Sequence, residues 1–200
     1  MRTITKEVFT FDELSEPAKE RARESYRAHG FDYYWWACVY DDAKHIAKLM
    51  GISIDEIYFS GFWSQGDGAS FTGSYRYAKG AVEHVKAWAP EDEELHRIAK
   101  SLQNIQKRHF YSLQASITEG AGSNHYSHSG TMHVDVRDDM RSMYADLGDA
   151  EEDLADLMRS FADWVYRQLE SEYNHLASDE QVDEILIVNE YEFAEDGSIY

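Results

Sequence analysis

Residues 52–80 read ISIDEIYFSGFWSQGDGASFTGSYRYAKG, and this stretch decides the fold. Its first part, ISIDEIYFSGF, is rich in β-branched and aromatic residues, which favour a strand. SQGDGAS follows as a turn, because its glycines and aspartate tolerate positive φ. A return strand then carries the alternating aromatic residues Phe71, Tyr75 and Tyr77. The stretch therefore predicts an antiparallel β-hairpin.

Two helices are expected before this hairpin. Ser15 is a suitable N-cap for a helix that runs to about Ala28 and stops at Gly30. A second helix is expected from near Asp32 to a stop at Gly51, because apolar residues recur at helical spacing. These apolar positions are Trp36, Val39, Tyr40, Ala43, Ala47 and Met50.

Further elements follow the hairpin. Pro90 opens a third helix, EDEELHRIAKSLQNIQKRH, and the segments FYSLQASITEG and TMHVDVR predict two more strands. A long helix is expected from about Asp149 to Leu176, with one apolar face. Ser178 caps a last segment, in which the run ILIV fits a helix or a strand. The predicted class is α+β, an antiparallel sheet of about four strands packed with four to five helices in the order ααββαββαα.

Length and composition predict a single domain. The 200 residues are 43% hydrophobic, which is enough for a sizeable core, and no Pro/Gly/Ser-rich stretch could act as a linker. No apolar run is long enough to span a membrane, and MRTITKEVF lacks the features of a secretory signal. The one cysteine, Cys38, is expected to be buried among aromatic residues. We therefore expect one domain over 1–200 in the cytoplasm of a bacterial cell, with its oligomeric state open.

Negative charge dominates the chain and is unevenly placed. The sequence has 38 acidic and 19 basic residues, for a net charge of −19. Residues 149–200 form an acidic helical part with sixteen acidic residues against two arginines, Arg159 and Arg167. Such a surface attracts basic partners and repels nucleic acids and anionic membranes. We expect a basic host protein or nucleoprotein complex as the partner, without direct binding of nucleic acid or membrane.

The acidic residues of 149–200 are the first candidate site. A helix rises about 1.5 Å per residue and duplex DNA carries one charge per about 1.7 Å, so closely spaced carboxylates resemble a phosphate ladder. A solvated surface is the alternative, with Arg167 pairing to Asp163 or Glu170 along the helix. The later part of this stretch has no basic residue and is the better binding face. The candidates are Asp149, Glu152, Asp153, Asp156, Asp163, Glu170, Asp179, Glu180, Asp183, Glu184, Glu190, Glu192, Glu195 and Asp196.

A histidine cluster is the second candidate. His125, His128, His133 and Asp135 lie within eleven residues, and imidazole and carboxylate groups are suitable zinc ligands. On a strand His133 and Asp135 share one face. Their spacing matches no defined zinc motif, so chance clustering is the alternative. We therefore assign no metal or cofactor.

The hairpin tip GFWSQGDG is the third candidate. Phe62 and Trp63 could anchor a partner, because aromatic side chains contribute interface energy once they are buried. Alternatively, Trp63 folds back onto the domain. Ser64 does not fit the G-x-S-x-G pattern of a nucleophile, and Asp41 and Asp42 point about 100° apart on a helix. No catalytic residue is predicted, and a protein that is not an enzyme is expected.

Several stretches resemble a group of uncharacterised proteins of tailed bacteriophages and prophages. SGFWSQGDGASF is specific to this group, whose members are sometimes labelled as antitoxins of toxin–antitoxin stability systems. The other stretches are FDELSEPAKERARESYR, ELHRIAKSLQNIQKRHFYSLQASI, YSHSG, DWVYRQLESEY, SDEQVDE and NEYEF. The resemblance implies a phage context, in which small acidic proteins often antagonise host machinery.

Four functions are therefore open. The first is a phage-derived inhibitor of the anti-CRISPR or anti-restriction type, which occupies a host defence complex with a surface that imitates nucleic acid. The second is an antitoxin that neutralises a basic toxin. The third is a metal-dependent enzyme that uses His125, His128, His133 and Asp135. The fourth is a structural accessory protein whose charge serves only solubility.

Overall fold

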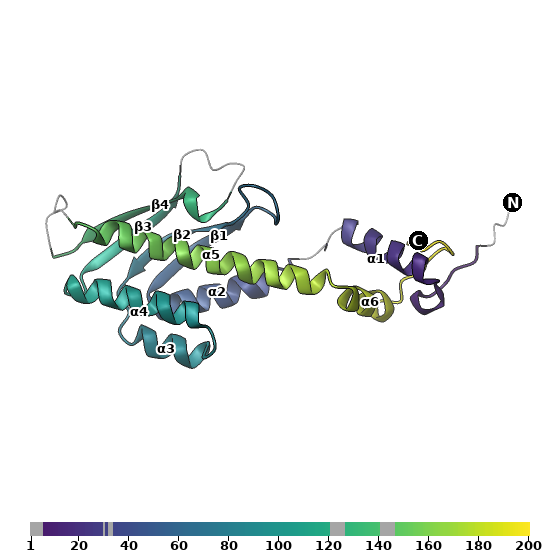
Figure 1. The fold of residues 1–200 in the computed structure, drawn as a ribbon, viewed down its shortest axis with the longest axis horizontal. Coiled ribbons are helices and arrows are strands. Elements are labelled where there is room, and N and C mark those ends of the chain that lie inside the picture. The colour runs from purple at the N-terminus through teal and green to yellow at the C-terminus, as the bar shows by residue number, and fades with distance from the viewer. Residues whose placement is uncertain (1–5, 30, 32–33, 121–126, 141–146) are drawn as a thin grey trace. The chain divides into compact units, whose positions relative to one another are not determined.

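The computed structural model describes residues 6–29, 31, 34–120, 127–140 and 147–200. The chain divides into two compact units (Figure 1). Unit 1 combines Met1–Trp36 with Ser171–Tyr200, and unit 2 is Ala37–Glu170. The long helix α5, Ala150–Leu176, contributes residues to both units. The single domain expected over 1–200 therefore stays a prediction.

Unit 2 is built on a four-stranded antiparallel sheet in the order β1-β2-β3-β4. The strands are β1, Ile52–Phe59; β2, Ala69–Arg76; β3, Leu113–Glu119; and β4, Met132–Asp138. The predicted hairpin is confirmed as β1 and β2, and the two later strands are confirmed as β3 and β4. The α+β class and the antiparallel sheet follow from the sequence as expected.

The two faces of the sheet differ in chemistry. Strand β4 alternates strictly between buried and exposed residues, and most of β3 does the same. One face is apolar, and Phe71 and Tyr75 lie there, each 1% exposed. A row of small polar side chains crosses the exposed face, where the register aligns Ser53, Ser74, Ser116 and Asp135. The period-2 pattern thus separates a core face from a solvated face.

Four α-helices pack in the described part of unit 2, and Figure 1 shows them gathered on one side of the sheet. They are α2, Ala37–Met50; α3, Ala81–Trp88; α4, Glu93–Arg108; and the first part of α5. Phe161 of α5 contacts Phe71 of β2 with ring centroids 5.9 Å apart. Gln106 of α4 is fully buried, and its amide bonds both the N–H and the C=O of Leu113 at the start of β3.

Two expectations about these helices are wrong in part, and one helix was missed. Helix α2 begins at Ala37 and not near Asp32, because Trp35 and Trp36 form a turn that precedes it. Helix α4 begins at Glu93, after an Asp92 cap, and not at Pro90. Helix α3 was not predicted. It starts after Gly80 without any side-chain cap, so the usual start signal is missing.

Unit 1 contains a short 3₁₀ helix η1, Phe11–Glu13, helix α1, Glu16–His29, and helix α6, Asp179–Val188. The run ILIV is therefore helical. Ser178 caps α6 as predicted, since its hydroxyl accepts a hydrogen bond from the Gln181 N–H at 3.3 Å. Seven buried residues form the core of this unit, and they come from both ends of the chain. They are Phe11, Leu14, Ala18, Ala22, Val182, Leu186 and Phe193.

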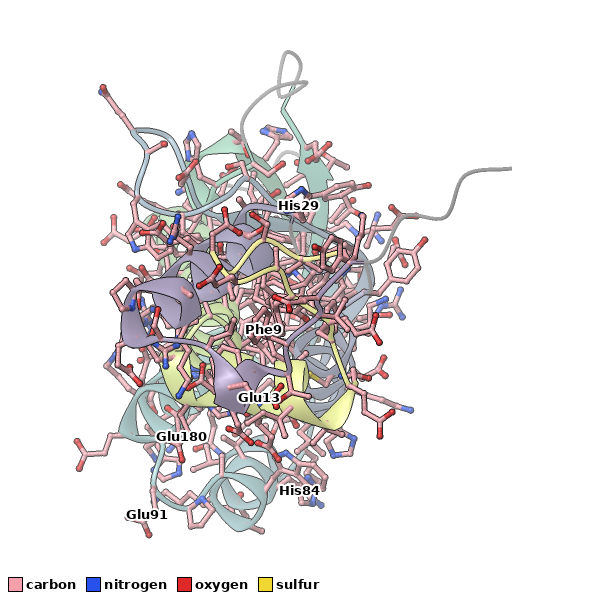
Figure 2. The ribbon with its side chains drawn as sticks, turned by 90° about the vertical axis from the view of Figure 1, so that its right-hand side faces the viewer. Phe9, Glu13, His29, His84, Glu91 and Glu180 are labelled. Carbon is pink, nitrogen blue, oxygen red and sulfur yellow. The ribbon has the colours of Figure 1, made fainter. Side chains whose placement is uncertain are left out.

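The C-terminal segment holds the two ends of the chain together. Phe9 and Phe193 form an antiparallel bridge with backbone hydrogen bonds of 2.9 Å in both directions. Figure 2 looks onto this unit, with Phe9 and Glu13 on the stretch before α1. Gly197 packs on α1 so closely that a Cβ atom would lie 2.0 Å from the Ala18 carbonyl oxygen, and only glycine fits there.

Aromatic rings line unit 1 from Tyr34 to Tyr191. Successive ring centroids lie 5.4–6.1 Å apart along the series Tyr34, Trp36, Trp35, Tyr173, Phe31, Tyr26 and Tyr191. Trp35 is 9% exposed whereas Tyr34 is 79% exposed, so only part of this run is core. Cys38 is exposed at the start of α2, and the expectation of a buried thiol is wrong. The helix turns that side chain outward because Ala43, Ile46 and Ala47 form its buried face.

Candidate functional site

The acidic residues after Ser178 fall into two sets, and the aspartates form the first. Arg23 of α1 grips Asp183 of α6 with two parallel bonds, Nε to Oδ1 at 2.6 Å and Nη2 to Oδ2 at 2.7 Å. Arg27 pairs with Asp179 one turn earlier on α6 through a single bond from Nη2 to Oδ1, and its Nε donates to the Ala177 carbonyl oxygen at 2.8 Å. Both arginines lie on one face of α1, four residues apart, as the two aspartates do on α6.

These pairs overturn one sequence-based expectation. The later acidic stretch lacks basic residues of its own, but α1 supplies them to Asp179 and Asp183. Asp196 lies 4.0 Å from Arg21 and accepts a hydrogen bond from the Ser198 N–H at 3.0 Å. The hydrogen bond that Arg23 donates to Asp183 raises the pKa of Arg23 above its ordinary value. Asp179 and Asp183 therefore join α6 to α1, and because all three aspartates already have a basic neighbour they are poor candidates for binding a basic partner.

The glutamates form the second set. All five glutamates after Ser178 are exposed, and none forms an ion pair with any residue that the structure describes. They are Glu180, Glu184, Glu190, Glu192 and Glu195. Two of them share one face of α6 with two exposed aliphatic residues, at spacings of four, three and one. We call this surface the outer face of α6; it comprises Glu180, Glu184, Ile187 and Val188.

A groove of about 410 Å³ lies beside this face, within unit 1. Its floor is apolar, because it includes the core residues Phe11 and Leu186. Its rim carries three carboxylates, and none of its lining residues is basic. We call it the acidic groove; it is lined by Thr10, Phe11, Asp12, Leu186, Ile187, Glu190, Tyr191 and Glu192.

The end of α6 shapes this groove. The N–H of Glu190 bonds the Ile187 carbonyl oxygen at 3.0 Å, and the N–H of Tyr191 bonds that of Leu186 at 3.1 Å. This pair of bonds is a Schellman motif, in which the residue at the Glu190 position is usually glycine. Glu190 adopts φ 53°, a left-handed conformation that costs a residue with a side chain about 1 kcal/mol. The chain thus places a carboxylate on the rim where glycine would fold more easily.

The acidic candidates on α5 up to Glu170 belong to unit 2. Asp153 pairs with Arg108 at 3.0 Å, and Asp156 pairs with Arg159 at 2.9 Å. Arg167 pairs with Glu94 of α4, so the expected pairing with Asp163 or Glu170 is wrong. The packing of α4 beside α5 brings that partner closer than the neighbours along the helix. The other candidates are Asp149, which precedes α5, and Glu152 and Asp163, all of them exposed, and Glu170, which is half-buried.

The hairpin tip presents one aromatic side chain to solvent. Trp63 is 69% exposed and has φ 70°. Phe62 is half-buried, and its ring lies 5.5 Å from Tyr166 of α5 and 5.9 Å from Phe59. Ser64 takes part in a turn, because its N–H donates to Asp67 Oδ2 at 2.7 Å. Phe62 therefore anchors the tip on unit 2, while the exposed Trp63 stays a candidate contact.

The histidine cluster is only partly described. His125 lies outside the described residues. The Nδ1 atom of His128 accepts a hydrogen bond from the Gly130 N–H at 3.1 Å and so caps a 3₁₀ turn, Ser129–Thr131. His133 and Asp135 share the exposed face of β4, as predicted. Within the described part of the chain, no three His, Cys, Asp or Glu residues are placed to hold a metal ion.

Of the eight residues that line the acidic groove, the sequence singles out Glu190 and Glu192 alone as candidates. Thr10, Phe11 and Asp12 meet the C-terminal residues of the groove because the Phe9–Phe193 bridge and the core of unit 1 join the two ends of the chain. No local pattern in either segment predicts this pairing. The one available signal was the T-x-x-E sequence of a capping box, in which the Glu13 carboxylate accepts a hydrogen bond from the Thr10 N–H at 2.9 Å.

Comparison with known proteins places most of the chain in one family. A family model described as a domain of unknown function, DUF8835, matches residues 35–179. No curated protein and no solved structure matches the chain. None of the helices in the described residues is both long and apolar enough to cross a membrane.

Proposed function

The chain belongs to the DUF8835 family, and we propose that it is a non-enzymatic interaction protein that binds a basic partner through the outer face of α6. The observation that carries this proposal is the division of the acidic residues in unit 1. Every aspartate after Ser178 lies within 4.0 Å of an arginine of α1, whereas the glutamates have no such partner among the described residues. Those glutamates are the charges free to meet another protein.

The outer face of α6 combines charge with apolar area. Glu180 and Glu184 provide the charge, and Ile187 and Val188 are 45% and 70% exposed beside them. Charges steer encounter with a basic surface, and aliphatic side chains contribute binding energy once they are buried. A net charge of −19 adds long-range attraction to such a partner.

The resemblance to phage and prophage proteins suggests the kind of partner. We place it among host defence complexes with a basic groove that ordinarily holds nucleic acid, of the CRISPR or restriction type. A carboxylate-bearing helix would occupy part of that groove in place of phosphates. The mimicking surface in this proposal is smaller than the whole acidic stretch, because ion pairs neutralise Asp153, Asp156, Asp179 and Asp183.

Affinity purification from host cells tests the proposal with two charge-reversal variants. Glu180→Lys with Glu184→Lys alters the outer face of α6. Asp41→Lys with Glu91→Lys alters two exposed residues of unit 2 by the same net charge. A partner that binds as proposed is retained by the wild type and by the second variant, is lost from the first, and is released as salt rises.

The biological role is read out by phage plating. Expression of the protein should raise the plating efficiency of a susceptible phage on cells that carry the captured defence system, and the Glu180/Glu184 variant should not. If the captured partner survives high salt, or if both variants lose it equally, the outer face of α6 is not the binding surface. Growth rescue from a neighbouring basic toxin would identify the chain as an antitoxin that uses the same charges.

A further inference from the structure

From the acidic groove we infer a more specific mode of recognition: the groove binds a linear segment of the partner in which one aliphatic or aromatic side chain is flanked by lysines or arginines. This inference rests on the proposed function and names the chemistry of the segment. It concerns Asp12, Glu190 and Glu192 with the apolar floor between them; of the residues of the outer face of α6, the groove includes Ile187 but neither glutamate.

The floor accounts for the apolar side chain of the segment. Phe11 and Leu186 are 4% and 0% exposed, so they are fixed in the core of unit 1, and Ile187 forms a wall that is 45% exposed. The groove of about 410 Å³ lies within the range of about 300–1,000 Å³ that is typical of ligand sites. An aliphatic or aromatic side chain would gain free energy by leaving water for this floor.

The rim accounts for the flanking charges. Asp12, Glu190 and Glu192 are all exposed, and none pairs with a basic residue in the described part of the chain. Two cations lie 5.6 Å and 5.7 Å from the centroid of the Phe11 ring, and both pair with carboxylates outside the rim. Lys19 pairs with Glu16, and Arg23 is held by Asp183 and Glu20. The rim therefore favours lysine or arginine over any neutral or acidic flank.

A substitution at Glu190 distinguishes an effect on binding from an effect on folding. Its left-handed backbone at φ 53° suits glycine better than glutamate, so Glu190→Gly should stabilise unit 1 while it removes a rim carboxylate. A residue kept only for the fold would show the opposite relation, because its loss would destabilise the unit.

The first experiment uses three fluorescein-labelled peptides with the full-length protein. KKLKK is the probe, KKSKK lacks the apolar side chain, and EELEE reverses the charges. Fluorescence anisotropy at low salt should show KKLKK binding several-fold more tightly than KKSKK, with no binding of EELEE. Equal affinities for KKLKK and KKSKK would mean that the apolar floor is not used, and the inference would be overturned.

The second experiment locates the site with matched variants. Glu190→Gln removes one exposed charge just after α6 and Glu184→Gln removes one within it, but only Glu190 lines the groove. KKLKK should bind Glu190→Gln about twofold to fivefold more weakly than wild type, and Glu184→Gln nearly as well as wild type. Glu190→Gly should bind as weakly as Glu190→Gln and melt at a higher temperature than wild type.

Amide chemical shifts provide an independent readout. Titration with KKLKK should shift the amide signals of Asp12, Ile187 and Glu192. Shifts confined to Glu180 and Glu184, or a lack of peptide binding, would overturn the inference about the groove. The proposed function would then still be decided by the affinity purification. Loss of the partner in that experiment depends on the outer face of α6, so the two ideas fail separately.

Discussion

The division between structural aspartates and available glutamates predicts a measurable coupling between Arg23 and Asp183. Both bonds of this pair are short, at 2.6 Å and 2.7 Å, and the side chains are 14% and 27% exposed. Exposed ion pairs contribute about 0.2–1 kcal/mol, whereas removing one partner of a buried pair costs about 3–5 kcal/mol. A bidentate but partly solvated pair lies between these limits, so we expect a coupling free energy of about 1–2 kcal/mol.

A double-mutant cycle measures this coupling. Arg23→Ala, Asp183→Ala and the double variant are compared with the wild type. Arg23 also contacts Glu20 and lies 5.7 Å from the centroid of the Phe11 ring. Both contacts are lost in each variant without Arg23, so their contributions cancel in the coupling free energy. Because the chain has two compact units, the free energy is best taken from native-state hydrogen exchange of the α6 amides.

The pair Arg159–Asp156 provides the control cycle. Its N···O distance is 2.9 Å, its residues are three apart on α5, and its side chains are 37% and 64% exposed. A pair of this kind should couple by about 0.3–0.5 kcal/mol. If the Arg23–Asp183 coupling were no larger than this control, Asp183 would not be held as the structure indicates. The contrast between aspartates and glutamates would then lose its basis.

Three further predictions concern single features. Gln106→Leu should destabilise unit 2 by about 2–4 kcal/mol in urea unfolding, because it leaves the buried N–H and C=O of Leu113 unpaired; an unchanged midpoint would contradict this. Hydrogen bonds lower the pKa of Glu13 and Asp196, so each stabilises the folded state above its unfolded pKa and loses this effect as pH falls through its folded pKa. The melting temperature of unit 1 should therefore fall less as pH is lowered when Glu13 and Asp196 are both replaced by alanine than it does in the wild type. Cys38 should react with a maleimide without denaturant, since its side chain is exposed; labelling only after unfolding would argue against this.

The sequence predicts the sheet well because its signals are local. The β1–β2 hairpin combines a period of two with a glycine-rich turn, and both are visible within thirty residues. Helix α5 is equally clear from its apolar face. Helix α3 escapes prediction because it is eight residues long and begins after a left-handed Gly80 with no capping side chain. Sequence propensity therefore identifies elements whose ends carry turn or capping residues, and it misses elements whose ends do not.

The site depends on contacts that no local pattern contains. Arg23 and Asp183 are separated by 160 positions in the chain, so the neutralisation of Asp183 follows only from the packing of α1 on α6. The same holds for Asp12 and Glu192, which face one groove from opposite ends of the sequence. Composition predicts a strongly acidic C-terminal part. It cannot distinguish carboxylates that fold the protein from those that remain available to a partner.

The position of the family match bears on what the proposed function can explain. The match covers unit 2 and ends at Asp179, whereas Glu180, Glu184 and the acidic groove lie outside residues 35–179. A property that the DUF8835 family shares should therefore rest on unit 2, for example on the polar sheet face or on the hairpin tip with Trp63. If unit 1 recognises a basic segment as proposed, that recognition is added to whatever the family has in common. Charge reversal at Glu180 and Glu184 should abolish partner capture without altering any activity that depends on unit 2.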